Sequence, residues 1–299
     1  MLDLLIIGSG PAGLSAAVYA RRSNLNMMVA EKDSFGVGQV SGSVKVDNYL
    51  GFSGISGFDL GMIFREHAAA LGVPFFEGTA VSVRRTDGGW RTGFDDGRFI
   101  DSRALIYAAG ARPRRLKVKG EQEFIGKGIS FCSVCDGPFF KDKTVAVIGG
   151  GDSALDASAH LADLCRKVYL IHWRSDFRGN DATYERICNL DRVEVLKNAS
   201  IRSIQGDDVL SSVSLSNGRV LKVDGLFEAI GSEPRTEILN GLVMLDHEGY
   251  IVAGEDCETT AAGFFAAGDV RTKPLRQVST AVADGANAVY SAMRYLKRH

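Results

Sequence analysis

Two short apolar runs, each ending in glycines and followed by a helical pattern, organise this chain. Leu4–Ile7 is continuously apolar and runs into Gly8–Gly13, after which residues 14–21 are rich in alanine. Thr144–Ile148 runs in the same way into Gly149–Ala154 and a second helical segment. Unbroken apolar strands of this kind are typical of parallel sheets that are covered on both faces. The pattern therefore predicts two strand–loop–helix units of the same type.

Each unit continues into short strands that are separated by turn residues. Asp87–Gly89 and Asp96–Gly97 interrupt the first series, and Asn217–Gly218 interrupts the second. These dipeptides favour tight hairpins. Both series end in an apolar strand closed by glycine, Leu105–Gly110 and Leu226–Gly231. We therefore expect each unit to be a parallel sheet that carries an antiparallel layer.

The two units are predicted to be nested rather than consecutive. Gly263–Val270 is one further buried strand, followed by a helix over about residues 277–296, and only the first unit needs them. The predicted fold class is α/β, with two Rossmann-like three-layer domains, the first split and the second inserted in it. Crossings near Ala111–Phe124 and Ser232–Leu239 make a natural hinge. The predicted domain bounds are residues 1–112 with 240–299 for the split domain and 113–239 for the inserted domain.

Composition and charge limit the classes of partner that the protein can bind. The 299 residues, 45% of them apolar, suffice for about two domains, and 35 basic against 36 acidic residues give a formal net charge of -1. This balance offers no excess of positive charge for nucleic acid or for anionic lipid. No basic segment precedes the first apolar run, and no run approaches the roughly 20 apolar residues of a spanning helix. We expect a cytoplasmic protein without nucleic acid or membrane partners.

The first glycine loop has the spacing of a dinucleotide-binding loop. Gly8 permits the tight turn off the strand, Gly10 lets the backbone approach a pyrophosphate, and Gly13 lets helix and strand pack closely. The N-terminus of the helix then offers free N–H groups to the phosphates. The next strand, Met27–Ala30, ends in Glu31, whose carboxylate can accept hydrogen bonds from a ribose diol. Together these features predict a dinucleotide site.

The second loop is followed by basic instead of acidic residues. Its next strand, Val168–Ile171, ends in a segment that contains His172, Arg174 and Arg178. An acid at this place repels a 2'-phosphate, whereas arginines neutralise it through forked hydrogen bonds. The segment favours a phosphorylated nicotinamide nucleotide, and the alternative is a pair of solvated arginines on a loop.

Cys132 and Cys135 are the two cysteines, of five, with a meaningful spacing. A Cys-x-x-Cys pair is a redox dithiol, half of a zinc site or a chance occurrence. The sequence has no second pair or Cys/His couple at ligand spacing, so we expect no metal. In a redox pair the second thiol resolves a mixed disulfide at high effective concentration. Asp136, beside Cys135, is either a general acid for the leaving thiolate or a turn residue.

These segments together resemble the low-molecular-weight thioredoxin reductases, over nearly the whole chain. The matching segments are Gly8–Gly13, Gly38–Gln39, Asp47–Tyr49, Cys132–Gly137, Gly149–Ala154, Ala229–Gly231, Phe265–Val270 and Arg276–Val278. The resemblance implies FAD in the split domain, a nicotinamide nucleotide in the inserted domain, and a homodimer. It also implies that Cys135 faces the flavin, that Cys132 attacks the disulfide of a thioredoxin-like protein, and that Asp136 is the acid.

The resemblance also assigns the cofactor-binding residues. For FAD they are Gly8, Gly10, Pro11, Ala12, Gly13, Glu31, Gln39, Asn48, Ala109, Gly110, Gly268, Asp269, Arg276, Gln277 and Val278. For the nicotinamide nucleotide they are Gly149, Gly151, Asp152, Ser153, Ala154, His172, Arg174 and Arg178.

Two departures from the family pattern leave the electron donor open. Trp173 stands where members that use NADPH usually carry an arginine, and Arg235 replaces a usual asparagine. NADPH is the expected donor, and NADH or another donor is the alternative. The leading function is a thioredoxin-disulfide reductase. The alternatives are a ferredoxin-dependent reductase, an FAD-dependent dithiol oxidase and a non-catalytic redox sensor, and the intact second glycine loop argues against the oxidase.

Overall fold

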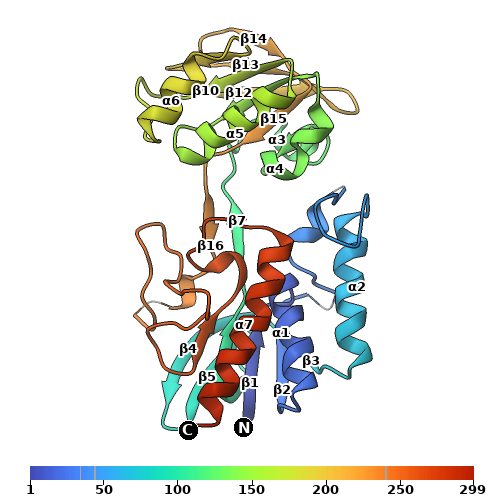
Figure 1. The fold of residues 1–299 in the computed structure, drawn as a ribbon, viewed down its shortest axis with the longest axis vertical. Coiled ribbons are helices and arrows are strands. Elements are labelled where there is room, and N and C mark those ends of the chain that lie inside the picture. Colours follow the sequence, from blue (N-terminus) through green and yellow to red (C-terminus); the bar gives the residue numbers. More distant parts are fainter. Residues whose placement is uncertain (34, 44, 240) are drawn as a thin grey trace. The chain divides into compact units, whose positions relative to one another are not determined.

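The computed structural model describes residues 1–33, 35–43, 45–239 and 241–299, and the chain divides into two compact units (Figure 1). Unit 1 is Met1–Arg112 with Glu233–His299, and unit 2 is Pro113–Ser232. Residues 233–239, which we expected in the inserted domain, therefore belong to unit 1. Their place has a local cause, because the N–H of Arg235 donates to the carbonyl of Gly110 and the Tyr107 hydroxyl donates to the carbonyl of Arg235. Asn240, the predicted start of the returning segment, lies outside the described residues.

Unit 1 is built on parallel strands. They are β1 (Leu2–Ile7), β2 (Met27–Glu31), β3 (Phe75–Glu77), β6 (Phe99–Tyr107) and β17 (Phe264–Ala266). Their order across the sheet is β3-β2-β1-β6-β17. Strand β17 returns from the end of the chain and pairs with β6, so that Phe264 lies opposite Leu105. The predicted fold class, with a split first domain, is confirmed.

Helices and an antiparallel layer cover the two faces of this sheet. The helices are α1 (Pro11–Arg22), α2 (Gly57–Ala70) and α7 (Val278–Leu296), with 3-10 turns η1 (Gln39–Gly42), η3 (Glu237–Leu239) and η4 (Gly268–Val270). The antiparallel partners of β6 are β5 (Gly89–Phe94) and then β4 (Ala80–Thr86), joined at the predicted turns. Leu4 and Ile6 pack towards α1 and α7, whereas Leu5 and Ile7 share a core with Trp90. This alternation of side chains along β1 is why one strand serves two cores.

Unit 2 repeats the plan. Its parallel strands are β8 (Ile129–Ser130), β9 (Thr144–Ile148), β10 (Lys167–Ile171), β11 (Val193–Leu196) and β15 (Gly225–Glu228), in the order β11-β10-β9-β15-β8. Helices α5 (Asp152–Leu164) and α6 (Asp181–Cys188) share one core with the sheet, and the antiparallel strands β12 (Ile201–Gly206), β13 (Leu210–Leu215) and β14 (Val220–Lys222) share the other. The short helices are α3 (Glu121–Phe124), α4 (Ser133–Asp136) and the 3-10 turn η2 (Gly137–Phe140).

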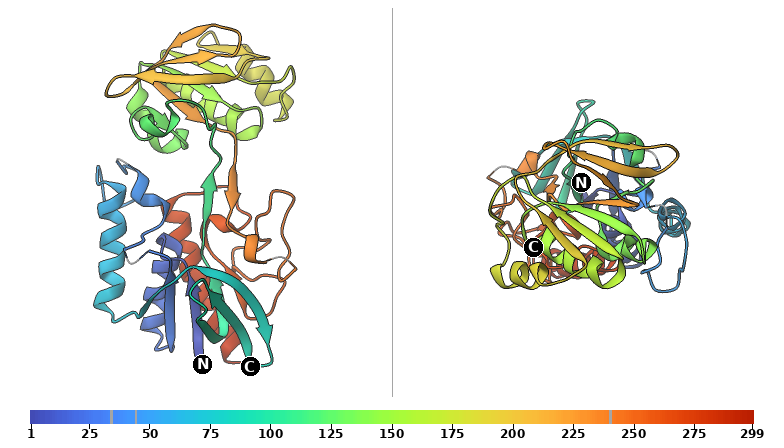
Figure 2. Two further views of the ribbon diagram at one scale, coloured as in Figure 1. Left: turned by 180° about the vertical axis from the view of Figure 1, so that it is seen from behind. Right: turned by 90° about the horizontal axis from the view of Figure 1, so that it is seen from above.

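The chain passes between the units twice, and the two crossings pair with each other. Strands β7 (Ala111–Pro113) and β16 (Ser232–Pro234) form a two-stranded ribbon. The N–H of Arg114 donates to the carbonyl of Gly231 at 3.0 Å, which extends the pairing into unit 2. The ends of the inserted unit are therefore neighbours in space. Both termini of the chain lie at the end of unit 1 remote from this ribbon (Figure 2).

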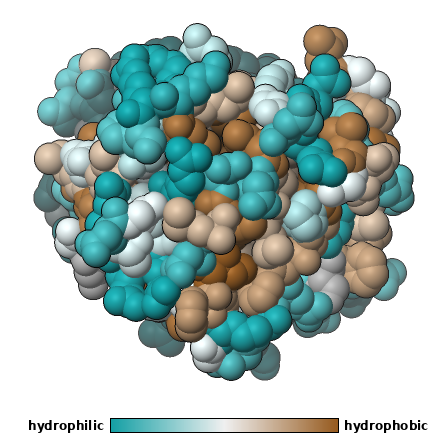
Figure 3. Space-filling model, turned by 90° about the horizontal axis from the view of Figure 1, so that it is seen from below, coloured by the Kyte–Doolittle hydropathy of each residue, from teal (hydrophilic) through white to brown (hydrophobic). Residues whose placement is uncertain are grey.

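The end of unit 1 that carries the termini has a mixed surface. Apolar side chains lie there between polar ones (Figure 3), and a hollow is lined by Met1, Leu2, Met28, Phe76 and Ile100 among others. Within the part of the chain that the structure describes, each helix is too short or too polar to cross a bilayer.

A buried acid lies at the carboxyl end of β15. Glu228 is 3% exposed, and burial, together with the neighbouring carboxylate of Glu121, raises its pKa to about 8. Glu121 itself accepts hydrogen bonds from the Nε of Arg115 at 2.6 Å and from the N–H groups of Leu116 and Lys117. The donors of the first crossing therefore favour the charge on Glu121, and Glu228 remains protonated near neutral pH.

We predict that Glu228→Gln stabilises the protein at high pH. The folded state keeps a proton on Glu228 that the unfolded chain loses above its ordinary pKa of 4.5, so this residue lowers stability as pH rises from 4.5 to about 8. Glutamine is a neutral analogue that retains a donor for Glu121. Denaturant unfolding at pH 9 should show a gain in the free energy of unfolding on the order of 3 kcal/mol for the variant. At pH 5 the free energy of unfolding should change little.

The control variant is Glu123→Gln, which alters an exposed carboxylate on α3, the short helix that also carries Glu121. If Glu228→Gln gives the same change in unfolding free energy at pH 5 and pH 9, Glu228 does not titrate as described.

Candidate active site

The first glycine loop has the steric requirements that its spacing predicts. A Cβ on Gly8, whose φ is +102°, lies 2.5 Å from the carbonyl oxygen of Ala108, and one on Gly13 lies 1.8 Å from the carbonyl oxygen of Gly8. Neither position admits a side chain, because both contacts are with backbone. At Gly10, by contrast, the nearest atom is 3.6 Å away, in Gly38. The backbone at Gly10 is therefore open to a ligand, as a pyrophosphate site requires.

The helices that follow the two glycine loops begin without a side-chain cap. Gly10 and Gly151 are the N-cap residues of α1 and α5, and neither supplies a capping hydrogen bond. In contrast, Ser56 caps α2 and Asn180 caps α6 through side-chain oxygens. The first N–H groups of α1 and α5 are thus left for another acceptor, and a helix N-terminus in this state favours phosphate.

Several predicted FAD residues from distant parts of the sequence lie together around the first loop. The amide of Asn48 donates to the Oε1 of Gln277 at 3.0 Å, and a Cβ on Gly110 lies 3.7 Å from the Nε2 of Gln39. Glu31, at the end of β2, accepts from the N–H of Ser9 at 2.8 Å. The remaining predicted residues lie beside these ones: Pro11 and Ala12 in the first turn of α1, Ala109 next to Gly8, and Val278 at the start of α7.

Asp269 is half-buried as a residue, but one of its carboxylate oxygens is fully buried. Its Oδ1 is inaccessible and receives no hydrogen bond from the described residues. Burial raises its pKa, and the positive charges of Lys273 and Arg276 oppose that effect. Arg276 donates through Nε to the Asp269 carbonyl at 3.4 Å, and its guanidinium lies 4.0 Å from the ring centre of Tyr250. An unpaired buried carboxyl is costly unless it meets a ligand, so this residue fits a polar cofactor.

An imidazole packs against the second glycine loop, in a position that the sequence did not predict. His172 is 2% exposed, and a Cβ on Gly150 lies 2.1 Å from its Cε1. The ring centre lies 4.8 Å from that of Phe177, with the two rings tilted by 40°, and burial lowers the pKa of His172. The structure therefore places His172 buried beneath the loop, unlike Arg174 and Arg178, with which we grouped it and which are exposed. Strand β10 ends with this side chain pointing into the core, which its spacing from the glycines did not reveal.

The basic segment after β10 is tied to the second loop by its backbone. The N–H of Arg178 donates to the carbonyl of Gly150 at 2.7 Å, and the N–H of Asn180 donates to the carboxylate of Asp152 at 2.7 Å. Asp152 thus anchors the segment to the first turn of α5, where Ser153 and Ala154 follow. Trp173 is 61% exposed, and the guanidinium of Arg174 lies 4.2 Å from its ring centre. The indole and this arginine form one exposed surface.

The two spaced cysteines are joined. Cys132 and Cys135 form a disulfide across the single turn of α4, and the N–H of Cys135 donates to the Sγ of Cys132. The hydroxyl of Ser130 donates to the Oδ2 of Asp136 at 2.6 Å and accepts from the N–H of Cys132 at 3.0 Å. Burial raises the pKa of Asp136. An acid whose pKa is raised by burial is therefore held in the same turn as the disulfide.

Comparison with known proteins decides which family combines these features. The family model described as pyridine nucleotide-disulphide oxidoreductase matches residues 2–285. The chain belongs to this family. Within it, the predicted resemblance to the low-molecular-weight thioredoxin reductases is confirmed, and the protein is an oxidoreductase of that type.

Individual relatives cover the chain from end to end. Thioredoxin reductase of Mycoplasma pneumoniae is 36% identical over 293 residues, 96% of this chain and 93% of the relative. A 34.2 kDa protein of the rubredoxin operon of Clostridium pasteurianum is also 36% identical, over 99% of this chain and 97% of its own. The crystal structure of thioredoxin reductase from Streptococcus pyogenes superposes with a TM-score of 0.94 at 35% identity, covering 100% and 99% of the two chains.

Sequence reasoning missed two residues of this reductase. Ser130 links Asp136 to the backbone of Cys132, and its one signal is a hydroxyl residue two positions before the cysteine. Gly38, with φ of +75°, packs on Gly10, where its built Cβ lies 2.7 Å from the Gly10 Cα. Its signal is the neighbouring Gln39, which the resemblance assigns to FAD binding.

We predict that Ser130→Ala raises the pKa of Asp136 further. The hydroxyl of Ser130 donates to the charged carboxylate and so lowers the pKa against the effect of burial. Removing that donor leaves burial unopposed. Carboxyl carbon NMR of the labelled protein should show the Asp136 titration moving to higher pH. Ser133→Ala, the control in the same turn, should leave this titration unchanged. A titration at lower pH in Ser130→Ala contradicts this account.

Proposed function

We propose that this reductase carries electrons from NADPH through FAD to the Cys132–Cys135 disulfide and on to the disulfide of a thioredoxin-like protein. The observation that carries the proposal is the disulfide itself, held in one turn with Asp136, whose pKa burial raises, and in the same unit as the second glycine loop. We further propose that unit 1 is the FAD domain and that unit 2 is the nucleotide and dithiol domain.

Unit 1 has groups that suit the phosphates and the ribose of FAD, and one acid with an unpaired oxygen that suits a polar atom of the cofactor. The open backbone at Gly10 and the uncapped start of α1 suit the pyrophosphate, and Glu31 suits a ribose diol. Asp269 offers an unpaired oxygen, and Asn48 with Gln277 marks the start of α7, whose positive end stabilises negative charge. FAD bound there would supply two-electron transfer between the nucleotide and a disulfide.

The nucleotide site is proposed at the start of α5. Its uncapped N–H groups suit the pyrophosphate, and Arg174 and Arg178 suit a 2'-phosphate. The buried His172 is then a support for Gly150, and Asp152 holds the arginine segment in place. Arg174 rests on the Trp173 indole, an arrangement that leaves its donors free in the plane of the guanidinium.

The protein side of the thiol chemistry follows from the turn that holds the cysteines. Reduction of the disulfide with two electrons and two protons gives two thiols. Cys132, as thiolate, attacks the partner disulfide, forms a mixed disulfide and expels one partner thiolate, which Asp136 protonates. Cys135 then attacks the Sγ of Cys132, which restores the Cys132–Cys135 disulfide and releases the second partner thiol. The short spacing makes this resolving step intramolecular.

One unit carries both the dithiol and the nucleotide loop, and both have to reach the flavin in turn. We propose that the paired crossings β7 and β16 act as the hinge for this exchange. The partner is a small thioredoxin-like dithiol protein, the working state is a homodimer, and the location is the cytoplasm. Arg235, which follows the second crossing, has its backbone bound to Gly110 and Tyr107, so its departure from the family pattern concerns only its side chain.

We expect Cys132→Ser and Cys135→Ser to separate the two half-reactions. Each variant should lose at least 1000-fold in reduction of the protein disulfide, since neither can complete the thiol cycle, yet each should still bleach its flavin with NADPH at close to the parental rate. Stopped-flow absorbance and an insulin-coupled thioredoxin assay measure the two steps. Cys188→Ser, which removes an exposed cysteine, is the matched control. Loss of flavin bleaching in both cysteine-pair variants contradicts the proposed order of steps.

Donor choice is tested by anaerobic mixing of the oxidised protein with NADPH and, separately, with NADH. We expect faster bleaching with NADPH, and Arg178→Ala should reduce that preference about tenfold, as expected for loss of one charge-assisted contact. If neither nucleotide bleaches a flavin that dithionite reduces, the exposed Trp173 marks a changed donor site. A ferredoxin-dependent reductase or an FAD-dependent dithiol oxidase then replaces the proposal.

A further inference from the structure

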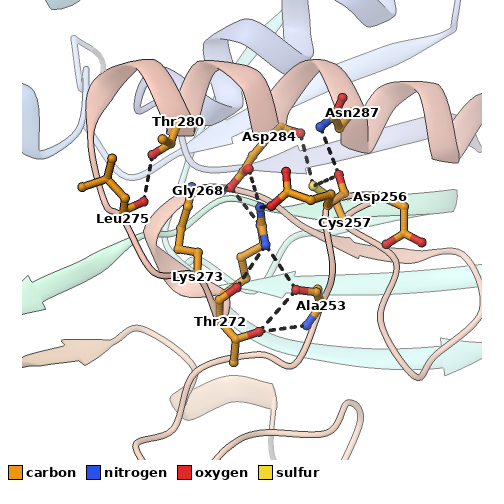
Figure 4. A network of polar contacts seen from close by, with 12 residues as sticks. Ala253, Asp256, Cys257, Gly268, Thr272, Lys273, Leu275, Thr280, Asp284 and Asn287 are labelled. Atoms are coloured by element: carbon orange, nitrogen blue, oxygen red, sulfur yellow. Dashed lines mark hydrogen bonds and ion pairs between the residues drawn. The ribbon is translucent and has the colours of Figure 1, made fainter.

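A buried cluster of charges lies beneath the turn that carries Asp269. Asp284, on α7, is 2% exposed, and its carboxylate accepts from the Nε and Nη2 of Arg271 at 2.9 and 2.6 Å and from the Nζ of Lys273 at 2.7 Å. Both cationic side chains are only 3% exposed. Figure 4 shows these groups converging between α7 and the segment that follows β17. None of them belongs to the site residues named above.

The same carboxylate also holds the backbone of the turn. The N–H of Gly268 donates to the Oδ2 of Asp284 at 2.8 Å. Gly268 has a φ of +80°, and its built Cβ lies 2.9 Å from the Cβ of Ala12 in the first turn of α1. Arg271 further donates to the carbonyl oxygens of Ala253 and Thr272. One carboxylate thus fixes η4 against the start of α1, where Gly268 and Asp269 are the residues proposed to meet FAD.

The cluster contains more positive than negative charge. Arg271 and Lys273 carry two positive charges against the single buried negative charge of Asp284. Glu255 also approaches Arg271, at 3.5 Å, but its side chain is 86% exposed and is screened by water. Asp269 is the nearby acid that this excess acts upon: Lys273 favours its charged form, whereas Asp284 opposes it. Removing Lys273 and removing Asp284 therefore change the local charge in opposite directions.

We propose that Asp284 is a positioning residue for the flavin, which holds the Gly268–Val270 turn in place and limits the positive charge that Lys273 presents to Asp269. The inference rests on the proposed binding of FAD at Asp269. It gives a role to a carboxylate in the middle of a helix, where burial of an acid and two bases is costly without a function.

The test uses the FAD-loaded protein and the variants Asp284→Asn and Lys273→Met. Asp284→Asn leaves both cations without their counter-charge and loosens the turn, so the rate of FAD release on dilution should rise at least tenfold and the midpoint potential of the bound flavin should shift upward. Lys273→Met removes one cation but keeps the Arg271 and Gly268 contacts of Asp284. Its potential should shift downward, and its rate of FAD release should change less than threefold.

Asp101→Asn is the matched control, because Asp101 also accepts two hydrogen bonds from an arginine, Arg91, in the antiparallel layer of the same unit. It should leave both the potential and the release rate unchanged. General structural damage does not move the potential in opposite directions in two variants, so shifts of the same sign overturn the proposal. A folded Asp284→Asn that releases FAD at the parental rate overturns it as well.

Should Asp284→Asn fail to fold, Lys273→Met decides by itself, since an unchanged or raised potential contradicts the charge balance described. The parental protein separates this outcome from failure of the proposed function. If the purified chain binds no flavin at all, the proposed function is wrong before any variant is made.

Discussion

Each glycine loop packs so closely against neighbouring backbone that a side chain has no room there. At Gly13 a methyl group has no room because a carbonyl oxygen of Gly8 occupies its place, and at Gly149 a built Cβ lies 2.2 Å from the carbonyl oxygen of Ala229. These contacts let a helix begin directly above the carboxyl edge of a parallel sheet. The unsatisfied N–H groups of that helix then lie at the edge where the neighbouring strands also end. Every other group of the two proposed nucleotide sites is arranged around those helix ends.

Charged groups are buried at several places close to these edges, and they differ in how they are balanced. Glu121 is surrounded by donors of its own crossing, whereas Glu228 beside it keeps a proton. Asp284 is matched by two cations, whereas the Oδ1 of Asp269 has no hydrogen-bond partner among the described residues. Both oxygens of Glu228 also lack a partner in that part of the chain, but its raised pKa keeps this acid neutral. The Oδ1 of Asp269 is therefore left for the proposed flavin.

The fold was largely predictable from the sequence because its signals are local. Hairpin turns at Asp87–Gly89 and Asn217–Gly218 lie where their dipeptides predict, and Glu31 ends its strand as expected. What the sequence did not reveal depends on the direction of single side chains and on contacts between distant segments. His172 points into the core although arginines follow it, and Asp284 meets Arg271 only because α7 packs beneath η4. The roles of individual residues in binding remain predictions of the resemblance.

The placement of unit 2 has a consequence for how the chain assembles during synthesis. When the ribosome has made β6, unit 1 still lacks β17 and α7, and the whole of unit 2 emerges before them. Closing so long a loop by a random search is slow. A folded unit 2, however, holds its own first and last residues together through Arg114 and Gly231. Once the insert has folded, the returning segment starts close to the end of the strand that it must join, and the loop that β17 has to close is shortened by the length of unit 2.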